Sequence, residues 1–296
     1  MRVEIHLLLR FLFMLSDNAL QEWLASQSLH ILAADALSGG CIAQCFCLRL
    51  SDGQRYFLKQ QERAEPGQFV AEAAGLEALA ATEGVPTPQV IWVSEQSLLL
   101  EYLPPAARQK SFSTVLGEGL ARQHCCPVEG FGFERDSWCG ATRQPNGMSA
   151  DGYQFFAERR LRYLARICGD KGLLSRRQMD RVERICERLP ELIPGQAPAL
   201  LHGDLWSGNV HTGPDGLPVL IDPAVYQGWP EAELAMTCLF GGFDQAFYSA
   251  YESNYPLLPD WRERIALYNL WHLLNHLSLF GRSYLQEVDS ILRRYA

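Results

Sequence analysis

The sequence has no excess of positive charge, no repeated CxxC spacing and no apolar run long enough to cross a membrane. Its 296 residues carry a formal net charge of -8, whereas binding to a nucleic-acid backbone needs a basic surface. The nine cysteines lack the paired spacing of a structural zinc site. We therefore expect no nucleic-acid partner, and we expect reduced thiols in a cytoplasmic protein.

The N-terminal segment MRVEIHLLLRFLFML is the stretch most similar to a signal peptide. Arg10 interrupts its apolar run, no small-residue cleavage site follows it cleanly, and it is too short to span a bilayer. We expect residues 1–16 to form an extension, with Met14 as an alternative start, and we expect no stable membrane association.

The chain is too long for one tight core, and its composition is that of a globular protein without repeats or a low-complexity tail. In the first part we expect a short helix and then four strands, at residues 17–31, 41–50, 55–60, 90–94 and 98–102. Between the second and third strands, one apolar face indicates a helix that begins at Pro66 and ends before Gly84.

Beyond Pro104 and Pro105 the pattern becomes helical. We expect helices at 112–124, 152–167 and 175–189 and from 231 to 294, with a short β-element at 199–202, 210–212 and 219–222. The sequence thus predicts an α+β fold of two lobes: a small β-rich N-lobe at 17–103 and a larger, mainly helical C-lobe at 104–296.

The segment LHGDLWSGN at 201–209 carries the strongest chemical signal. Phosphoryl transfer needs a carboxylate that orients or deprotonates the attacking hydroxyl, and oxygen ligands for the magnesium that bridges the phosphates. Asp204 fits the first need. Asn209 and Asp222, which ends the following strand, fit the second as metal ligands.

A second signal combines a strand lysine with an acid on the following helix. Kinases place an ammonium against the α- and β-phosphates of the nucleotide and hold it there with a carboxylate. Lys59 and Glu72 fit these two roles, with Glu77 and Glu62 as competing acids.

Two backbone segments complete the predicted nucleotide site. Gly39 and Gly40 precede the lysine hairpin, and glycine N–H groups can approach phosphate oxygens closely. Cys41 would then lie beside the phosphates, where its oxidation could gate nucleotide binding. The hinge from Glu101 to Leu103 offers main-chain groups to an adenine edge.

The histidines have structural interpretations. We expect His202 to hydrogen-bond the backbone of the loop, His124 to be structural, and His272 and His276 to lie on a packed helix face.

Several segments resemble the fructosamine kinase (ketosamine 3-kinase) family, which is related to aminoglycoside and choline kinases. They are LLHGDLWSGNV, VLIDPAVYQGWPEAELAM, FGGF and LLNHLSLFGRSY, and the likeness extends from Leu37 through SGGCIAQ, YFLK and EAAGLEAL to Tyr284. The N-terminal extension matches nothing in the family, and residues 106–111 match it loosely.

The resemblance implies a protein-kinase-like fold and ATP-dependent phosphorylation, with Mg²⁺, of O3 of a ketosamine, free or protein-bound. The 3-phosphates are unstable and release the amine, so the activity is deglycating. The family pattern assigns Asp204 as base, Asn209 and Asp222 as magnesium ligands, Lys59 and Glu72 as the phosphate-positioning pair, and Gly39-Gly40 as the phosphate loop.

The same resemblance suggests two substrate contacts. The indole of Trp206 would pack on the apolar face of the sugar, and Glu233 would meet the substrate amine. We expect a monomer or a homodimer. Three alternatives remain: a kinase for an aminoglycoside, choline or another amino alcohol; a nucleotide-binding pseudokinase; and a metal-dependent hydrolase built on His202 and Asp204.

Overall fold

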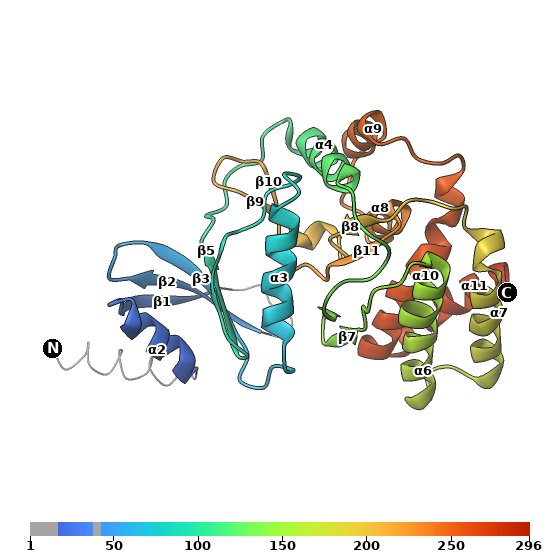
Figure 1. Cartoon of the computed structure of the whole chain (residues 1–296), viewed down its shortest axis with the longest axis horizontal. Helices are drawn as coiled ribbons and strands as arrows, with labels where there is room; N and C mark the ends of the chain where they lie inside the picture. Colours follow the sequence, from blue (N-terminus) through green and yellow to red (C-terminus); the bar gives the residue numbers. More distant parts are fainter. Residues whose placement is uncertain (1–16, 38–42) are drawn as a thin grey trace.

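The computed structural model describes residues 17–37 and 43–296. The expected extension and the segment with Gly39, Gly40 and Cys41 lie outside the described residues. A β-sheet with two helices comes first, and a helical part follows (Figure 1). This is the two-lobed α+β architecture that the sequence predicts. The residue at which the lobes divide stays a prediction.

The first lobe is built on an antiparallel sheet with the strand order β1-β2-β3-β5-β4. The strands are β1 (Ile31–Leu37), β2 (Gln44–Leu50), β3 (Arg55–Gln60), β4 (Val90–Val93) and β5 (Ser97–Glu101). Successive side chains of a strand point to opposite faces. Accordingly, Leu99 packs in one cluster with Leu20 and Leu24 of α2 (Asn18–Ser26), whereas Leu98 and Leu100 pack against α3 (Gln68–Ala80).

The predicted helix over 17–31 was too long, because residues 31–37 form an additional edge strand, β1. The side chain of Asp17 accepts a hydrogen bond from the N–H of Ala19 at 2.9 Å and caps α2. The helix ends at Ser26, and Ser28 has a φ of 55°, a left-handed conformation that stops a helix. Ile31 fits the helical spacing by coincidence.

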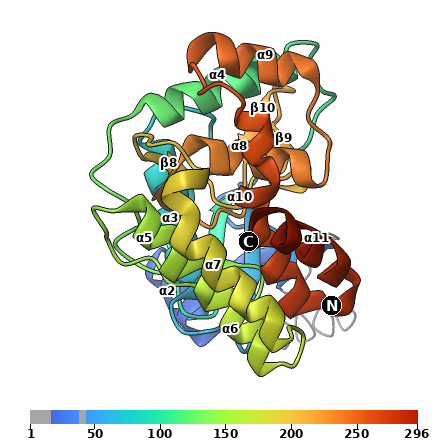
Figure 2. The same cartoon turned by 90° about the vertical axis from the view of Figure 1, so that its right-hand side faces the viewer.

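The second lobe is built around α10 (Trp261–Phe280), which lies among its other helices (Figures 1 and 2). Most side chains of α10 are buried. The helices of this lobe are α4 (Phe112–Cys125), α5 (Gly152–Phe156), η1 (Ala157–Arg162), α6 (Tyr163–Asp170), α7 (Arg176–Leu192), α8 (Pro230–Leu239), α9 (Gln245–Asn254), α10 (Trp261–Phe280) and α11 (Leu285–Tyr295), with the 3-10 turns η2 (Ser207–Asn209) and η3 (Arg282–Tyr284). The helical stretch expected from residue 231 onward is thus divided by loops.

Short strands lie among these helices. The predicted hairpin is confirmed as β9 (Val210–Thr212) with β10 (Pro218–Leu220), whereas β8 (Ala199–Leu201) pairs with β11 (Tyr226–Gly228). Local sequence patterns indicate neither β11 nor the hairpin of β6 (Ser137–Cys139) and β7 (Thr142–Gln144). Strands of three residues are too short to show an alternating pattern. Strand β6 contacts α3 and so joins the two lobes.

A buried arginine lies in the π-helical turn η1. The guanidinium of Arg160 lies 4.2 Å from the ring centre of Tyr226 and 4.7 Å from that of Phe155, and its Nη2 donates to Asn146 Oδ1 at 2.7 Å. Asn146 Nδ2 in turn donates to the carbonyl of Val225 at 3.1 Å. Aromatic faces stabilise a desolvated cation, so Arg160 can remain buried while it anchors the segment that follows Asp222.

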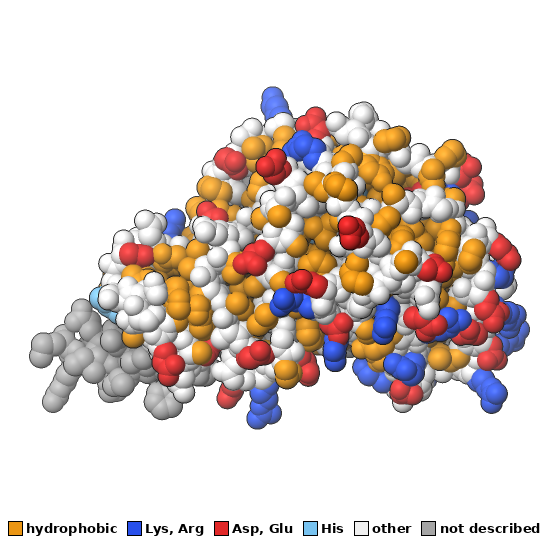
Figure 3. All heavy atoms as spheres, in the orientation of Figure 1, with side chains coloured by type: hydrophobic (Ala, Val, Ile, Leu, Met, Phe, Trp, Pro, Cys, Tyr) orange, Lys and Arg blue, Asp and Glu red, His pale blue; other side chains and the backbone are white. Residues whose placement is uncertain are grey.

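The surface matches the modest net charge. On the face in Figure 3, acidic and basic side chains are interspersed, and the described residues form no continuous basic stripe there. Among the described residues, no helix has both the length and the apolar character needed to cross a bilayer.

Close packing of α4 on α9 gives a test of the fold. A Cβ at Gly117 would lie 2.3 Å from the carbonyl oxygen of Phe247, so Gly117→Ala must move one helix. We expect this substitution to lower the free energy of unfolding in urea by about 1–3 kcal/mol.

Gly169→Ala in α6 is the matched control. Its Cβ would meet only the flexible side chain of Met179, at 3.4 Å. Because alanine favours a helix over glycine, this variant should be neutral or more stable. Equal stability of the two variants would contradict the observed packing of α4 on α9.

Candidate active site

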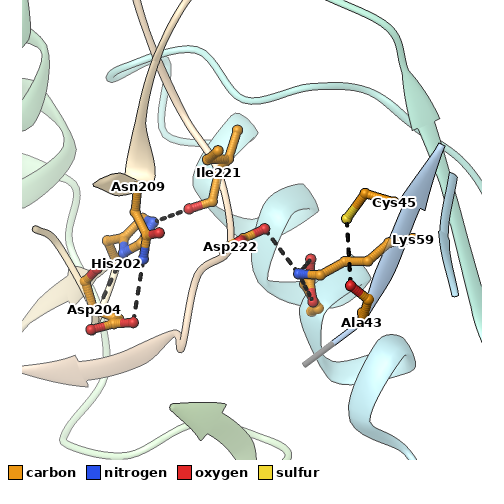
Figure 4. A network of polar contacts seen from close by, with 9 residues as sticks. Ala43, Cys45, Lys59, His202, Asp204, Asn209, Ile221 and Asp222 are labelled. Atoms are coloured by element: carbon orange, nitrogen blue, oxygen red, sulfur yellow. Dashed lines mark hydrogen bonds and ion pairs between the residues drawn. The ribbon is translucent and has the colours of Figure 1, made fainter. Parts of the chain in front are cut away.

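The side chains with candidate catalytic roles meet where the two lobes face each other (Figure 4). One group comes from the loop between β8 and β9, which carries His202, Asp204 and Asn209. Asp222 follows β10. Lys59 approaches from β3 on the opposite side.

The loop after β8 packs on the segment after Asp222. The N–H of Ala224 donates to the carbonyl of His202 at 2.8 Å. Gly203 has a φ of +81°, and a Cβ there would lie 2.1 Å from the carbonyl oxygen of Ala224. Only glycine fits this conformation and this close approach. The glycine of the HGD segment is therefore required for its contact with the DPA segment.

His202 supports the loop from within, as the sequence analysis predicts. Its Nε2 lies 2.9 Å from the carbonyl oxygen of Ile221, and the N–H of Asp204 donates to its Nδ1 at 3.2 Å. Because a carbonyl only accepts, Nε2 carries the proton and Nδ1 is bare. Burial lowers the pKa of His202 and so favours this neutral form.

The carboxylate of Asp204 lies in a partly enclosed environment. Asn209 Nδ2 donates to the Asp204 carbonyl at 2.9 Å and to Oδ2 at 3.3 Å. Burial raises the pKa of Asp204 to about 7.

Two further groups surround Asp204. Ligand atoms of Asp204, Cys139 and His272 all lie within 4.8 Å of one another. Burial raises the pKa of the Cys139 thiol, which remains protonated, and lowers that of His272, which remains neutral. Local motifs place neither Cys139 nor His272 beside Asp204, since both come from distant segments of the chain.

Glu233 lies below the loop, and its side chain is almost fully buried. Its Oε2 accepts the N–H of His202 at 2.5 Å, and its Oε1 accepts the N–H of Gly203 at 3.0 Å. With both oxygens held by the backbone, this position fits a role in shaping the loop. It does not fit the contact with a substrate amine that the sequence analysis expected, because the carboxylate does not face solvent.

Lys59 lies between two carboxylates from different parts of the chain. Its Nζ is 2.9 Å from both oxygens of Glu72 on α3 and 2.9 Å from Asp222 Oδ1. Glu62 and Glu77, the competing acids, are exposed. Burial alone would lower the pKa of Lys59, but Asp222 and Glu72 outweigh it and raise the pKa above its usual value, so Lys59 stays charged.

Asp222 has an unusual backbone. Its φ is +55°, which is rare for a residue other than glycine, and its side chain is 46% exposed. Such strained positions cluster at functional sites. The left-handed turn after β10 aims the carboxylate at Lys59.

The hinge departs in part from the expected adenine site. The carbonyl of Leu103 accepts a hydrogen bond from His211 Nε2 at 2.8 Å. If Leu103 contacts adenine, the contact would therefore be made by the Leu103 N–H. His211 lies on β9 and connects the hinge to the second lobe, and no local motif in the sequence indicates this contact. The N–H of Glu101 donates to the carbonyl of Gln89 at 2.9 Å, so this group pairs with the protein backbone and not with adenine.

Trp206 stands at the open side of the loop and is 39% exposed. A Cβ at Gly208 would lie 2.2 Å from the indole, and one at Gly242 would lie 2.5 Å from the Ser207 side chain. These glycines let the indole fold back over the loop and let the FGGF segment pack against it.

A strand lysine held by a helix acid, facing a loop with an aspartate, an asparagine and a second aspartate, defines a phosphotransferase of the protein-kinase-like class. The family model described as fructosamine kinase matches residues 15–296. The chain therefore belongs to the fructosamine kinase family, which confirms the resemblance.

Known relatives are similar over nearly the whole chain. A protein of Vibrio parahaemolyticus described as a probable ketoamine kinase is 37% identical over 95% of this chain and 96% of its own. A chloroplastic protein-ribulosamine 3-kinase of Oryza sativa subsp. indica is 32% identical over 95% of this chain and 84% of its own.

Solved structures agree with the fold. A candidate fructosamine-3-kinase of Thermobifida fusca superposes with a TM-score of 0.83 at 32% identity and covers 90% of this chain and 94% of its own. An ADP-bound aminoglycoside phosphotransferase gives a TM-score of 0.61 at 15% identity over 93% of this chain and 97% of its own. The second likeness shows the kinase-like fold alone.

The pairing of Lys59 with Glu72 is tested by one substitution on α3 and its control. Glu72→Gln removes the charge that holds the ammonium, and we expect kcat/KM for ATP to fall by about tenfold or more, equivalent to about 1.4 kcal/mol of transition-state stabilisation. Glu77→Gln makes the same change on the exposed side of the same helix. Steady-state kinetics should give Glu77→Gln the wild-type kcat/KM for ATP. An equal fall of kcat/KM in both variants would reject Glu72 as the partner of Lys59.

The position of Glu233 predicts an effect on turnover without direct contact with substrate. Glu233→Gln replaces one carboxylate oxygen by an NH2 group, which cannot accept a hydrogen bond from a backbone N–H. We expect kcat to fall by about tenfold while KM for the acceptor changes little. A rise in the acceptor KM alone, with kcat preserved, would instead restore the role in amine binding.

Proposed function

We propose that this protein transfers the γ-phosphate of ATP to O3 of a ketosamine and so starts the release of the amine. The observation that carries the proposal is the pairing of Lys59 with Glu72 and Asp222. It holds a charged ammonium opposite the loop with Asp204, where it could bind phosphates (Figure 4). In phosphoryl transfer, catalysis is mainly positioning and charge stabilisation.

Each side chain has a role in this proposal. Asp204 orients the sugar hydroxyl and accepts its proton, since its carboxylate lies on the loop that faces the nucleotide side. Lys59 holds the α- and β-phosphates, and Glu72 keeps it in place. Gly39 and Gly40 would offer their backbone N–H groups to the phosphates.

Asn209 and Asp222 would hold magnesium. Both offer hard oxygen donors, which this ion prefers, and Asp222 is half-exposed and held in a left-handed turn toward the site. When bound, the ion would neutralise charge on the phosphates. The side chains present thus fit the metal that ATP requires.

The ketosamine acceptor is favoured by the named relatives and by Trp206. The ketoamine and ribulosamine kinases match nearly the whole chain, whereas the aminoglycoside phosphotransferase shares the fold alone. The exposed indole beside Asp204 can cover the apolar face of a sugar. A pseudokinase is disfavoured, because Lys59 and Glu72 remain in contact.

ATP consumption with ribulose-lysine and fructose-lysine tests this function. We expect turnover of at least one ketosamine and a loss of about 10²- to 10⁴-fold in Asp204→Asn, the range for removal of a general base. Circular dichroism of the variant serves as the folding control. Choline and an aminoglycoside are run beside the ketosamines.

Two outcomes would reject the proposal. Turnover of choline or the aminoglycoside without turnover of any ketosamine would show that the acceptor is an amino alcohol and not a ketosamine. Full activity of Asp204→Asn would remove Asp204 as the base.

A further inference from the structure

A row of aromatic rings leads away from Asp204 along the surface of the second lobe. Trp206 lies 6.4 Å from Phe240 between ring centres, and Phe240 lies 5.1 Å from His276. His276 then lies 5.5 Å from Phe280 and 5.2 Å from Tyr284. These five side chains form a continuous strip, which we call the aromatic strip.

Two independent connections attach the aromatic strip to Asp204. Trp206 follows Asp204 by two positions on the same loop. On α10, His272 has a ligand atom within 4.8 Å of the Asp204 carboxylate, and His276 and Phe280 follow one and two turns later on the same face. At 1.5 Å per residue, Phe280 lies about 12 Å along the helix from His272.

Three rings of the aromatic strip are exposed. Trp206 is 39% exposed, Phe240 is 44% exposed and Phe280 is 60% exposed, whereas the other Phe, Tyr and Trp side chains of the described residues are buried or partly buried. Large exposed apolar groups that adjoin one another mark binding surfaces. The open end at Phe280 suits a ligand that continues beyond the site.

His276 lets the aromatic strip accept a cation. Its Nδ1 lies 2.8 Å from the carbonyl oxygen of His272, which only accepts, so Nδ1 carries the proton and Nε2 is an acceptor. Burial lowers the pKa of His276, and the ring therefore adds no positive charge. Aromatic faces attract ammonium groups and alkyl chains.

We propose that the aromatic strip is the subsite for the amine part of the ketosamine, an alkylammonium chain such as a glycated lysine. The nucleotide belongs on the side of Lys59, so the acceptor must enter from the side of the second lobe. With the sugar at Asp204 and Trp206, the amine substituent extends over Phe240 and His276 toward Phe280. The inference rests on the proposed ketosamine kinase function and adds a determinant of its selectivity.

The test compares two ribulosamines that differ only in the amine. One is made from methylamine, which is too short to reach Phe280, and the other from the ε-amine of Nα-acetyl-lysine methylamide. The measured quantity is kcat/KM for the lysine-derived ribulosamine divided by kcat/KM for the methylamine-derived one. In Phe280→Ala and Phe240→Ala we expect this ratio to fall about 2- to 10-fold, which corresponds to the free energy of one aromatic contact. Phe280→Tyr should restore the ratio.

Leu32→Ala is the matched control, because Leu32 is 49% exposed and lies on β1, away from the aromatic strip. It should leave the ratio at the wild-type value. If both alanine variants also keep the wild-type ratio while they turn over substrate, the aromatic strip is not a subsite.

A binding measurement separates failure of this inference from failure of the proposed function. A fluorescein-labelled peptide with one ribulosamine-lysine is titrated with protein without ATP, and fluorescence anisotropy is recorded. Weaker binding to Phe280→Ala than to Leu32→Ala supports the aromatic strip even if no ketosamine is phosphorylated. Equal binding to these two variants overturns it, whatever the activity.

Discussion

The ammonium of Lys59 joins carboxylates that come from both lobes. Glu72 approaches from α3 of the first lobe and Asp222 from the loop after β10 of the second, each at 2.9 Å. A buried charge is stable only when it is paired, so the sheet, the helix and the loop must come together for Lys59 to be buried. The same geometry brings the ammonium that we propose to bind phosphate to the side opposite Asp204.

The catalytic loop depends on a second set of contacts. Glu233 holds two of its backbone N–H groups, His202 links it to Ile221, and Gly203 allows the approach of Ala224. These contacts lie below the surface and need not touch a substrate. They join the HGD loop to the segment after Asp222 and to Glu233 on α8.

The aromatic strip extends the site from the reacting hydroxyl toward the rest of the acceptor. Rigid aromatic side chains bind with little loss of conformational entropy, and their faces tolerate different substituents. Because Phe280 at its end is exposed, the aromatic strip would leave room for amines of different length beyond the sugar.

Local patterns in the sequence determined the two-lobed order of elements, the helix that carries Glu72, and the motif with Asp204, Asn209 and Asp222, because periodicity and turn residues act over short distances. They failed at β1, where the pattern is ambiguous, and at β6, β7 and β11, where it is too short. Only the tertiary structure decided that Glu233 lies beneath the loop, and that Cys139 and His272 surround Asp204. Contacts between distant segments depend on packing and leave no mark in local spacing.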